Sequence, residues 1–345
     1  MAKKEDKLNY NALRAGLLKN GPGRLYFLYG PEDYLRELFL EELKKLCVPG
    51  GASDFGYRRL NGPALDLREL SGAVNSLPFM SERTLVEIHG FDLNKCREAE
   101  ADELEKILSD LPDYCTVVFV PAAEYEPDWR LRAGKSIKKH GEAIKFTSQE
   151  QGQLITWIKR RFAALGKTAD NAAATSLIFL SGDIMSGLIP EIEKIAASVQ
   201  GDSVSAAEVE RYAHHLPEAK VFELTDRMSA RDWDGAAALL AELLTAGEEP
   251  IRTLAAVGQQ LRRLYAARLA IDQKLGAAYV SKTCGIKFDF ITDKLMRAAR
   301  GFTQSQLRRA VALCAETDYA MKSSSEDNVD LMKTLLLRLA VAEVE

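Results

Sequence analysis

The change of pattern at Phe146 constrains the fold of this 345-residue chain more than any other feature of its sequence. Before it, short β-rich runs alternate with helical stretches, and several of the runs are continuously apolar, as buried parallel strands are. After it, nearly every segment has the apolar spacing of an amphipathic helix, and no further strand is convincing. The sequence therefore predicts an α/β layer with a parallel sheet, followed by helical bundles.

The expected elements follow from this periodicity. In the first part we expect strands at residues 24–29, 55–60, 84–88, 116–120 and 143–146, with helices at 33–46, 66–76, 95–109 and 131–140. Capping-box patterns at 147–150 and 205–208 each predict the start of a helix, and two further helices are expected at 171–181 and 185–199. Beyond Pro217 we expect helices at 219–229, 233–246, 250–274, 289–300, 304–321 and 327–344.

At ~100–200 residues per domain, the length of the chain corresponds to two or three domains, and the boundaries above favour three. Residues 1–147 form the α/β domain, residues 148–215 a small helical domain, and residues 216–345 a larger helical domain. The hydrophobic fraction of 47% and the charged fraction of 28% are ordinary for a globular protein and exclude a disordered or fibrous chain.

The charge, cysteine and histidine contents exclude several classes of function. The net charge is −4, so any nucleic-acid site must be a local basic patch. No apolar run approaches the ~18–20 residues of a membrane span, and the first residues lack the apolar core of a signal peptide, so we expect a cytoplasmic protein. The five cysteines include no C-x-x-C pair, and Cys115 opens an apolar run, which indicates reduced, packed thiols. The neighbouring His214 and His215 are interpreted as a solvated helix end, because adjacent helical residues do not chelate one metal.

The turn after the first strand is where a nucleotide-binding loop would lie. Such a loop needs glycines, a lysine for the β- and γ-phosphates, and a serine or threonine for Mg²⁺. The sequence YGPEDY at 29–34 keeps Gly30 but has Glu32 and Asp33 where a phosphate would bind. Two carboxylates suit the start of a helix and repel phosphate, so we interpret this turn as a capped strand-to-helix turn.

Other segments resemble catalytic motifs only in part. Gly134, Lys135 and Ser136 lack the earlier glycine of a phosphate loop and lie well past a strand, which favours a helix on a basic surface. Glu87 lies within an apolar run that resembles a Walker B strand, and without a phosphate loop it has nothing to act on. No other catalytic motif is present, so we predict no catalytic residue, no cofactor and no metal ligand.

The connection at residues 77–83 carries two large apolar side chains, Phe79 and Met80, next to Pro78. Connections usually run over the surface. Two interpretations are open: the side chains fold back onto their own sheet, which is the commoner case on composition alone, or they form a hydrophobic plug for a pocket on a partner.

Local basicity is the second positive feature. Lys135, Lys138 and Lys139 lie with Arg130 and Arg132 in one expected helix, and further clusters lie at 159–161 and 262–263. Such clusters can contact a phosphate backbone, although a solvated helix face is the commoner explanation. We consider Lys135, Lys138 and Lys139 as possible DNA-facing residues.

Several stretches, in this order, resemble one protein family. They are LYFLYGPEDYL at 25–35, SLPFMSERTLV at 76–86, EIEKI at 191–195, AKVFELTD at 219–226, GEEP at 247–250 and QQLRRL at 259–264. Together they resemble the delta subunit of the bacterial DNA polymerase III clamp loader, over nearly the whole chain.

This resemblance implies an AAA+-like fold in three domains, the third being a collar within a hetero-pentamer that also contains delta prime and gamma/tau subunits. It implies a subunit of the DNA polymerase III holoenzyme that has no catalysis of its own and does not hydrolyse ATP, in agreement with the missing lysine. It also implies work on primer–template DNA within the complex.

The resemblance further implies that the apolar connection is a wedge. In this family the wedge inserts into a pocket on the sliding clamp, the beta subunit, and favours the open ring for loading. Its tip is commonly Leu-Phe, which by position becomes Phe79 and Met80 here, with Leu77 as a supporting contact. Phe-Met departs from Leu-Phe, but both pairs are large and apolar, so we expect clamp binding to be kept.

Two other functions remain as alternatives. An AAA+-type ATPase with a divergent phosphate-binding loop would bind ATP saturably. A stand-alone DNA-binding module is disfavoured by the net charge of −4.

Overall fold

The computed structural model describes residues 9–49, 56–79, 81–245 and 247–341. The chain divides into two compact units: residues 1–150 with 184–186, and residues 151–183 with 187–345. The division into three domains at 147 and 215 therefore stays a prediction. Met80 and the start of the strand expected at 55–60 lie outside the described residues.

A five-stranded parallel sheet forms the centre of the first unit. Its spatial order is β2-β3-β4-β1-β5. The strands are β1 (Leu25–Tyr29), β2 (Tyr57–Asn61), β3 (Thr84–His89), β4 (Cys115–Val120) and β5 (Glu142–Lys145). Every residue of β1 and β4 is buried, because helices cover both faces of these central strands. The predicted parallel α/β layer is confirmed.

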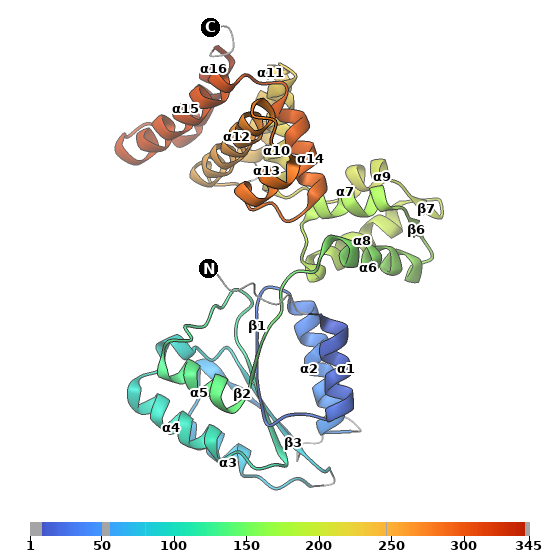
Figure 1. The fold of residues 1–345 in the computed structure, drawn as a ribbon, viewed down its shortest axis with the longest axis vertical. Helices are drawn as coiled ribbons and strands as arrows, with labels where there is room; N and C mark the ends of the chain where they lie inside the picture. The colour runs from blue at the N-terminus through green and yellow to red at the C-terminus, as the bar shows by residue number, and fades with distance from the viewer. Residues whose placement is uncertain (1–8, 50–55, 80, 246, 342–345) are drawn as a thin grey trace. The chain divides into compact units, whose positions relative to one another are not determined.

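The helices of the first unit form two layers, with α1 and α2 on one face of the sheet and α3, α4 and α5 on the other (Figure 1). These helices are α1 (Tyr10–Asn20), α2 (Asp33–Cys47), α3 (Leu67–Val74), α4 (Glu98–Ser109) and α5 (Arg132–His140). Two short 3₁₀ turns are η1 (Gly62–Ala64) and η2 (Leu93–Lys95). The sheet core includes Phe27 and Phe119, whose ring centroids lie 6.2 Å apart.

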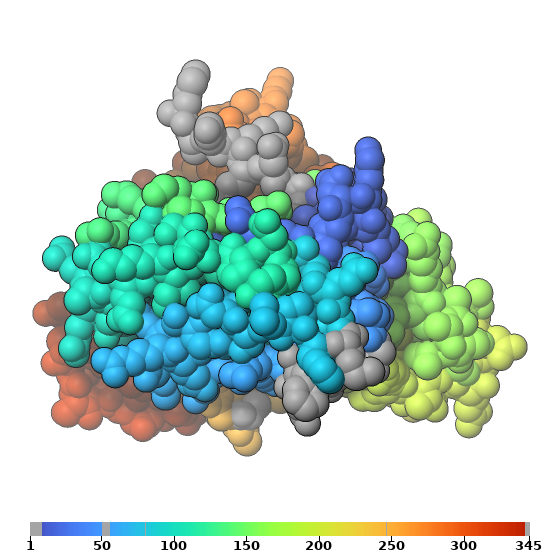
Figure 2. Space-filling model, turned by 90° about the horizontal axis from the view of Figure 1, so that it is seen from below, coloured from blue at the N-terminus to red at the C-terminus, as the bar shows by residue number. Residues whose placement is uncertain are grey.

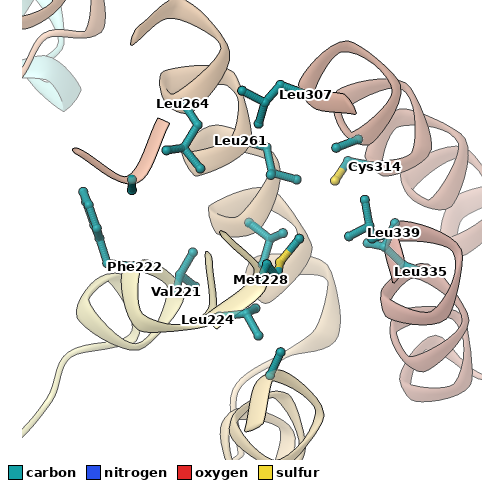
Figure 3. Packing of buried hydrophobic residues seen from close by; sticks show 14 of the residues in the cluster. Val221, Phe222, Leu224, Met228, Leu261, Leu264, Leu307, Cys314, Leu335 and Leu339 are labelled. Atoms are coloured by element: carbon teal, nitrogen blue, oxygen red, sulfur yellow. The ribbon is translucent and has the colours of Figure 1, made fainter. Parts of the chain in front are cut away.

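The second unit is almost entirely helical, as predicted. Its helices are α6 (Gln151–Ala164), α7 (Asn171–Ser181), α8 (Met185–Ser198), α9 (Ala206–Tyr212), α10 (Pro217–Ser229), α11 (Trp233–Thr245), α12 (Pro250–Asp272), α13 (Ala277–Cys284), α14 (Asp289–Ala299), α15 (Gln304–Ser323) and α16 (Asn328–Val341). One core of this unit joins the helices from α10 to α16, with Leu261 of α12 fully buried in it (Figure 3).

Three differences from the expected elements have physical reasons. The expectation of no strand after Phe146 is wrong, because β6 (Thr168–Ala169) pairs in parallel with β7 (Ser203–Val204), and two-residue strands carry no readable alternation. The sequence patterns at α1 and α13 are weak, with one buried residue in each, and we predicted neither helix. The helix expected at 95–109 begins only at Glu98, where the Glu100 carboxylate accepts a hydrogen bond from the N–H of Arg97.

Candidate interaction site

The connection between α3 and β3 exposes two large apolar side chains. Leu77 is 74% exposed and Phe79 is 59% exposed, whereas the adjoining ends of α3 and β3, at Val74 and Thr84, are buried. Met80, the third residue of the expected wedge, lies outside the described residues. Leu77 and Phe79 thus lie at the surface of the first unit, outside its own core.

Hydrogen bonds hold the connection at both ends. After α3, Tyr114 donates its hydroxyl to the carbonyl of Asn75, and Asn75 donates its side-chain amide to the carbonyl of Ser71 over 2.8 Å. Before β3, Ser81 donates its hydroxyl to the carbonyl of Arg83 over 2.8 Å, and the N–H of Thr84 donates to the carbonyl of Tyr114. The two exposed side chains are therefore carried by an anchored segment.

In space-filling view, the cyan part of the chain, which contains α3 and this connection, lies on the outer surface of the first unit (Figure 2). A surface segment that carries large apolar side chains and is fixed at both ends can present them to a partner at a small cost in conformational entropy.

The turn after β1 is shaped by Gly30 and Glu32. Gly30 has φ of +108°, and a Cβ at this position would lie 2.4 Å from the carbonyl oxygen of Phe146, so only glycine fits. Glu32 is fully buried, and its carboxylate accepts a hydrogen bond of 3.2 Å from the N–H of Met185, a residue that packs with the first unit.

This geometry is poor for phosphate. The N–H groups of Glu32 and Asp33 already donate to the carbonyls of Phe146 and Pro31, each over 3.1 Å. A phosphate loop needs such N–H groups to point at the ligand. A buried carboxylate at the same helix start adds negative charge where a phosphate would bring more.

The basic helix α5 is largely engaged within its own unit. Lys139 pairs with Glu105 over 2.8 Å, and Arg132 pairs with Asp102. The ammonium of Lys138 lies 4.3 Å from the centroid of the Trp129 ring. Lys135 is exposed on the same helix. The structure therefore keeps the three candidate lysines exposed on one helix, where Lys139 forms an ion pair and Lys138 lies over an aromatic ring that brings no counter-charge.

The segment at 134–136 that resembles a phosphate loop lies inside α5, with Gly134 and Ser136 buried, and it follows no strand directly. The predicted helix at this place is confirmed.

A buried ionic cluster surrounds Glu87 on β3, and sequence reasoning did not find it. The Glu87 carboxylate accepts hydrogen bonds from the Tyr57 hydroxyl at 2.8 Å and from the Lys44 ammonium at 3.1 Å, and it also contacts His89. Burial alone would raise the pKa of Glu87, but the hydrogen bonds from His89, Tyr57 and Lys44 lower it to about 2. The one sequence signal for this cluster was a charged residue, Glu87, within an otherwise apolar strand.

The remaining candidate residues have structural surroundings. Cys115 is fully buried, as predicted, and burial raises the pKa of its thiol. His214 and His215 lie between α9 and α10, where the ring Nε2–H of His215 donates to the carbonyl of Glu210 over 3.0 Å. Among the described residues no group of three or more metal-ligating side chains occurs. None of the helices in these ranges is both long enough and apolar enough to cross a bilayer.

The chain is similar to known proteins, in sequence and in structure, over nearly its whole length. It is 24% identical to DNA polymerase III subunit delta of Bacillus subtilis over 322 residues, which is 91% of this chain and 92% of the relative. It is 22% identical to a probable DNA polymerase III subunit delta of Aquifex aeolicus, covering 93% of this chain and 92% of the relative.

A solved structure of the Bacillus subtilis DNA clamp loader delta protein superposes with a TM-score of 0.54 at 23% identity, covering 96% of this chain and 99% of that one. The five-stranded parallel sheet and the helical remainder define the class of the protein, a parallel α/β domain followed by all-helical segments, and that structure shares this fold.

Two family models match the sequence. The model for DNA polymerase III, delta subunit, matches residues 26–147, and the model for the C-terminal domain of the DNA polymerase III delta subunit matches residues 218–339. Together they match more than half of the chain. The chain belongs to the DNA polymerase III delta subunit family.

Proposed function

We propose that this chain is the clamp-opening subunit of a clamp loader, and that it binds the sliding clamp through the connection between α3 and β3. The observation that carries the proposal is the exposure of Leu77 and Phe79 on a segment anchored at both ends. Met80, next along the chain, is proposed as the other half of the tip. The clamp, the other clamp-loader subunits and primer–template DNA are the proposed partners.

Burial of these side chains sets the scale of the interaction. Leu77 and Phe79 expose most of their side chains, and complete burial of such a side chain contributes ~1.5–3 kcal/mol. Together they would contribute about 3 kcal/mol or more, which corresponds to roughly a hundredfold in the dissociation constant. A few anchor residues usually carry most of the binding energy of an interface.

Clamp opening then follows from linkage. If the wedge fits the open ring better than the closed ring, binding shifts the ring equilibrium by that difference in affinity and by no more. The chain needs no bond chemistry for this step, and the energy of ATP enters through other subunits.

The test is a titration of the purified clamp with the full chain and with Leu77→Ser/Phe79→Ser, followed by Met80→Ser. We expect about a hundredfold weaker binding for the double variant. The matched control is Leu18→Ser, since Leu18 is 50% exposed on α1 of the same unit and lies outside the connection. Unchanged affinity in the folded double variant would remove the wedge assignment.

We propose also that the chain has no nucleotide-dependent catalysis of its own. The buried carboxylate of Glu32, the engaged N–H groups of Glu32 and Asp33, and the absence of a lysine from the turn at 30–34 support this. Equilibrium dialysis of the isolated chain with ATP is the test, and saturable binding would favour the divergent ATPase instead.

The basic helix α5 is proposed as a DNA-facing surface through Lys135, Lys138 and Lys139, which are all exposed. Lys139 pairs with Glu105 and the Lys138 ammonium lies over the Trp129 ring, so the prediction is made for Lys135. A phosphate contact by Lys135 would release counterions and make DNA binding by the assembled complex depend on salt.

A further inference from the structure

A cleft in the helical second unit has no role in the functions considered so far. It has a volume of about 120 Å³ and lies where α7, α10, α12 and α14 meet. Its walls are mainly apolar and include Phe179, Phe222 and Ile291. The rings of Phe179 and Phe222 pack edge to face with their centroids 5.3 Å apart, an arrangement that stabilises this wall. Phe222 extends from α10 beside α12 (Figure 3).

Two hydrogen-bond donors that line the cleft have no partner among the residues that the structure describes. They are the amide Nε2 of Gln260 on α12, a residue only 3% exposed, and the Nε of Arg263, a half-buried residue almost one turn further along the same helix. Buried donors are almost always paired in folded proteins, because an unpaired one costs free energy. Two such donors in one cleft point to an acceptor supplied from outside.

The charges around the cleft favour an anionic acceptor. Arg263 in the cleft wall carries a guanidinium. The ammonium of Lys294 lies 4.0 Å from the centroid of the Phe179 ring but pairs with Asp226 over 3.8 Å, so Arg263 is the main positive charge that a ligand in the cleft would meet. Glu218 is the one carboxylate among the lining residues that the structure describes, and it is exposed to water at the rim. A carboxylate can accept from an amide and a guanidinium at once, and such charge-assisted hydrogen bonds are the strong ones.

We propose that this cleft binds the carboxylate of an aspartate or glutamate side chain from a partner polypeptide. The apolar walls favour a side-chain carboxylate whose neighbouring residues are apolar. They disfavour an inorganic anion, because removing its tightly held water costs more free energy. The carboxylate accepts from Gln260 Nε2 and Arg263 Nε, while the neighbouring part of the partner covers the rings of Phe179 and Phe222. This site is independent of the wedge, which belongs to the other compact unit.

The test uses the full chain labelled with ¹⁵N-glutamine. It is titrated with an acetylated, amidated pentapeptide that has one glutamate between two leucines, and with the same peptide carrying glutamine instead. We expect a saturable shift of the Gln260 side-chain amide resonances with the glutamate peptide and about tenfold weaker binding of the glutamine peptide, which lacks the charge. Gln260→Met identifies the resonances by their loss.

Two variants separate the proposed contacts from a general effect. Arg263→Met should weaken the glutamate peptide about tenfold, the effect expected for losing one charge-assisted hydrogen bond. Arg262→Met is the matched control, because Arg262 is exposed on the same helix and does not line the cleft.

Three outcomes would overturn the proposal. If the Gln260 amide resonances do not shift at millimolar peptide, the cleft is filled by water only. If inorganic phosphate or acetate shifts them equally, the cleft is a site for free anions, and an equal loss of peptide affinity in Arg262→Met and Arg263→Met would exclude a specific contact by Arg263. None of these results bears on clamp binding by the first unit.

Discussion

Replacing Glu87 with glutamine should destabilise the first unit by about 3 kcal/mol at neutral pH and by much less in acid. In the folded chain the carboxylate is 1% exposed and accepts from Lys44 and Tyr57. Glutamine has nearly the same shape but no charge, so the variant keeps the packing and loses the ionic hydrogen bonds.

The magnitude comes from the lowered pKa of Glu87. A carboxyl whose pKa falls from 4.5 to about 2 on folding stabilises the folded chain by about 3 kcal/mol when it is ionised. Because the folded pKa is the lower one, this contribution is complete above about pH 4.5 and is lost as the pH falls towards 2. The difference between the two proteins should therefore shrink to about 1 kcal/mol near pH 3.

Urea unfolding followed by Trp129 fluorescence measures this difference. Trp129 belongs to the first unit and packs against Phe27, with the ring centroids 5.8 Å apart, so Trp157→Phe/Trp233→Phe leaves one reporter for that unit.

Glu41→Gln is the matched control, since Glu41 pairs with the same Lys44 over 3.3 Å but is 55% exposed. It should cost less than about 0.5 kcal/mol, as exposed pairs do. An equal loss in both variants, or a loss in Glu87→Gln that does not change with pH, would refute the reasoning.

Three further predictions concern the other features. Gly30→Ala should cost more than about 2 kcal/mol in the same assay, because φ is +108° and the new Cβ meets a backbone carbonyl; a smaller cost would contradict the strained turn. Lys135→Glu should reduce the salt dependence of DNA binding by the assembled complex. Lys139→Glu should change it less, because Lys139 is already paired with Glu105. Equal slopes of log affinity against log salt concentration in the two variants would remove the DNA-facing surface. Cys115, fully buried and with a raised pKa, should resist alkylation at pH 8 until the chain unfolds. Rapid labelling of Cys115 in the native chain, located by peptide mass analysis because Cys96 and Cys284 are only partly buried, would contradict its placement.

The sequence predicted the elements whose signals are local. The strands at β1 and β4 were predicted from continuous apolar runs, and the capping box at Ser205 occurs as its pattern indicates. Short-range hydrogen bonds and burial on both faces of a strand each require particular residue types at neighbouring positions, so a local sequence pattern predicts them.

The parts that could not be predicted depend on distant partners. The sequence around Glu32 predicts a helix cap. Its carboxylate instead accepts a hydrogen bond from the N–H of Met185, a residue 153 positions away, which no local pattern indicates. Glu87 reads as an interruption of an apolar strand, but Lys44 and Tyr57 from two other elements stabilise its charge. Gln260 follows the helical pattern, and only the packing of four helices makes its amide a buried, unpaired donor.

Amide hydrogen exchange of the full chain, measured with and without saturating sliding clamp, maps the surface that the clamp covers. We expect protection on clamp binding to be concentrated in peptides covering residues 75–83, between α3 and β3. Protection elsewhere in the chain with unchanged exchange in these peptides would contradict this expectation.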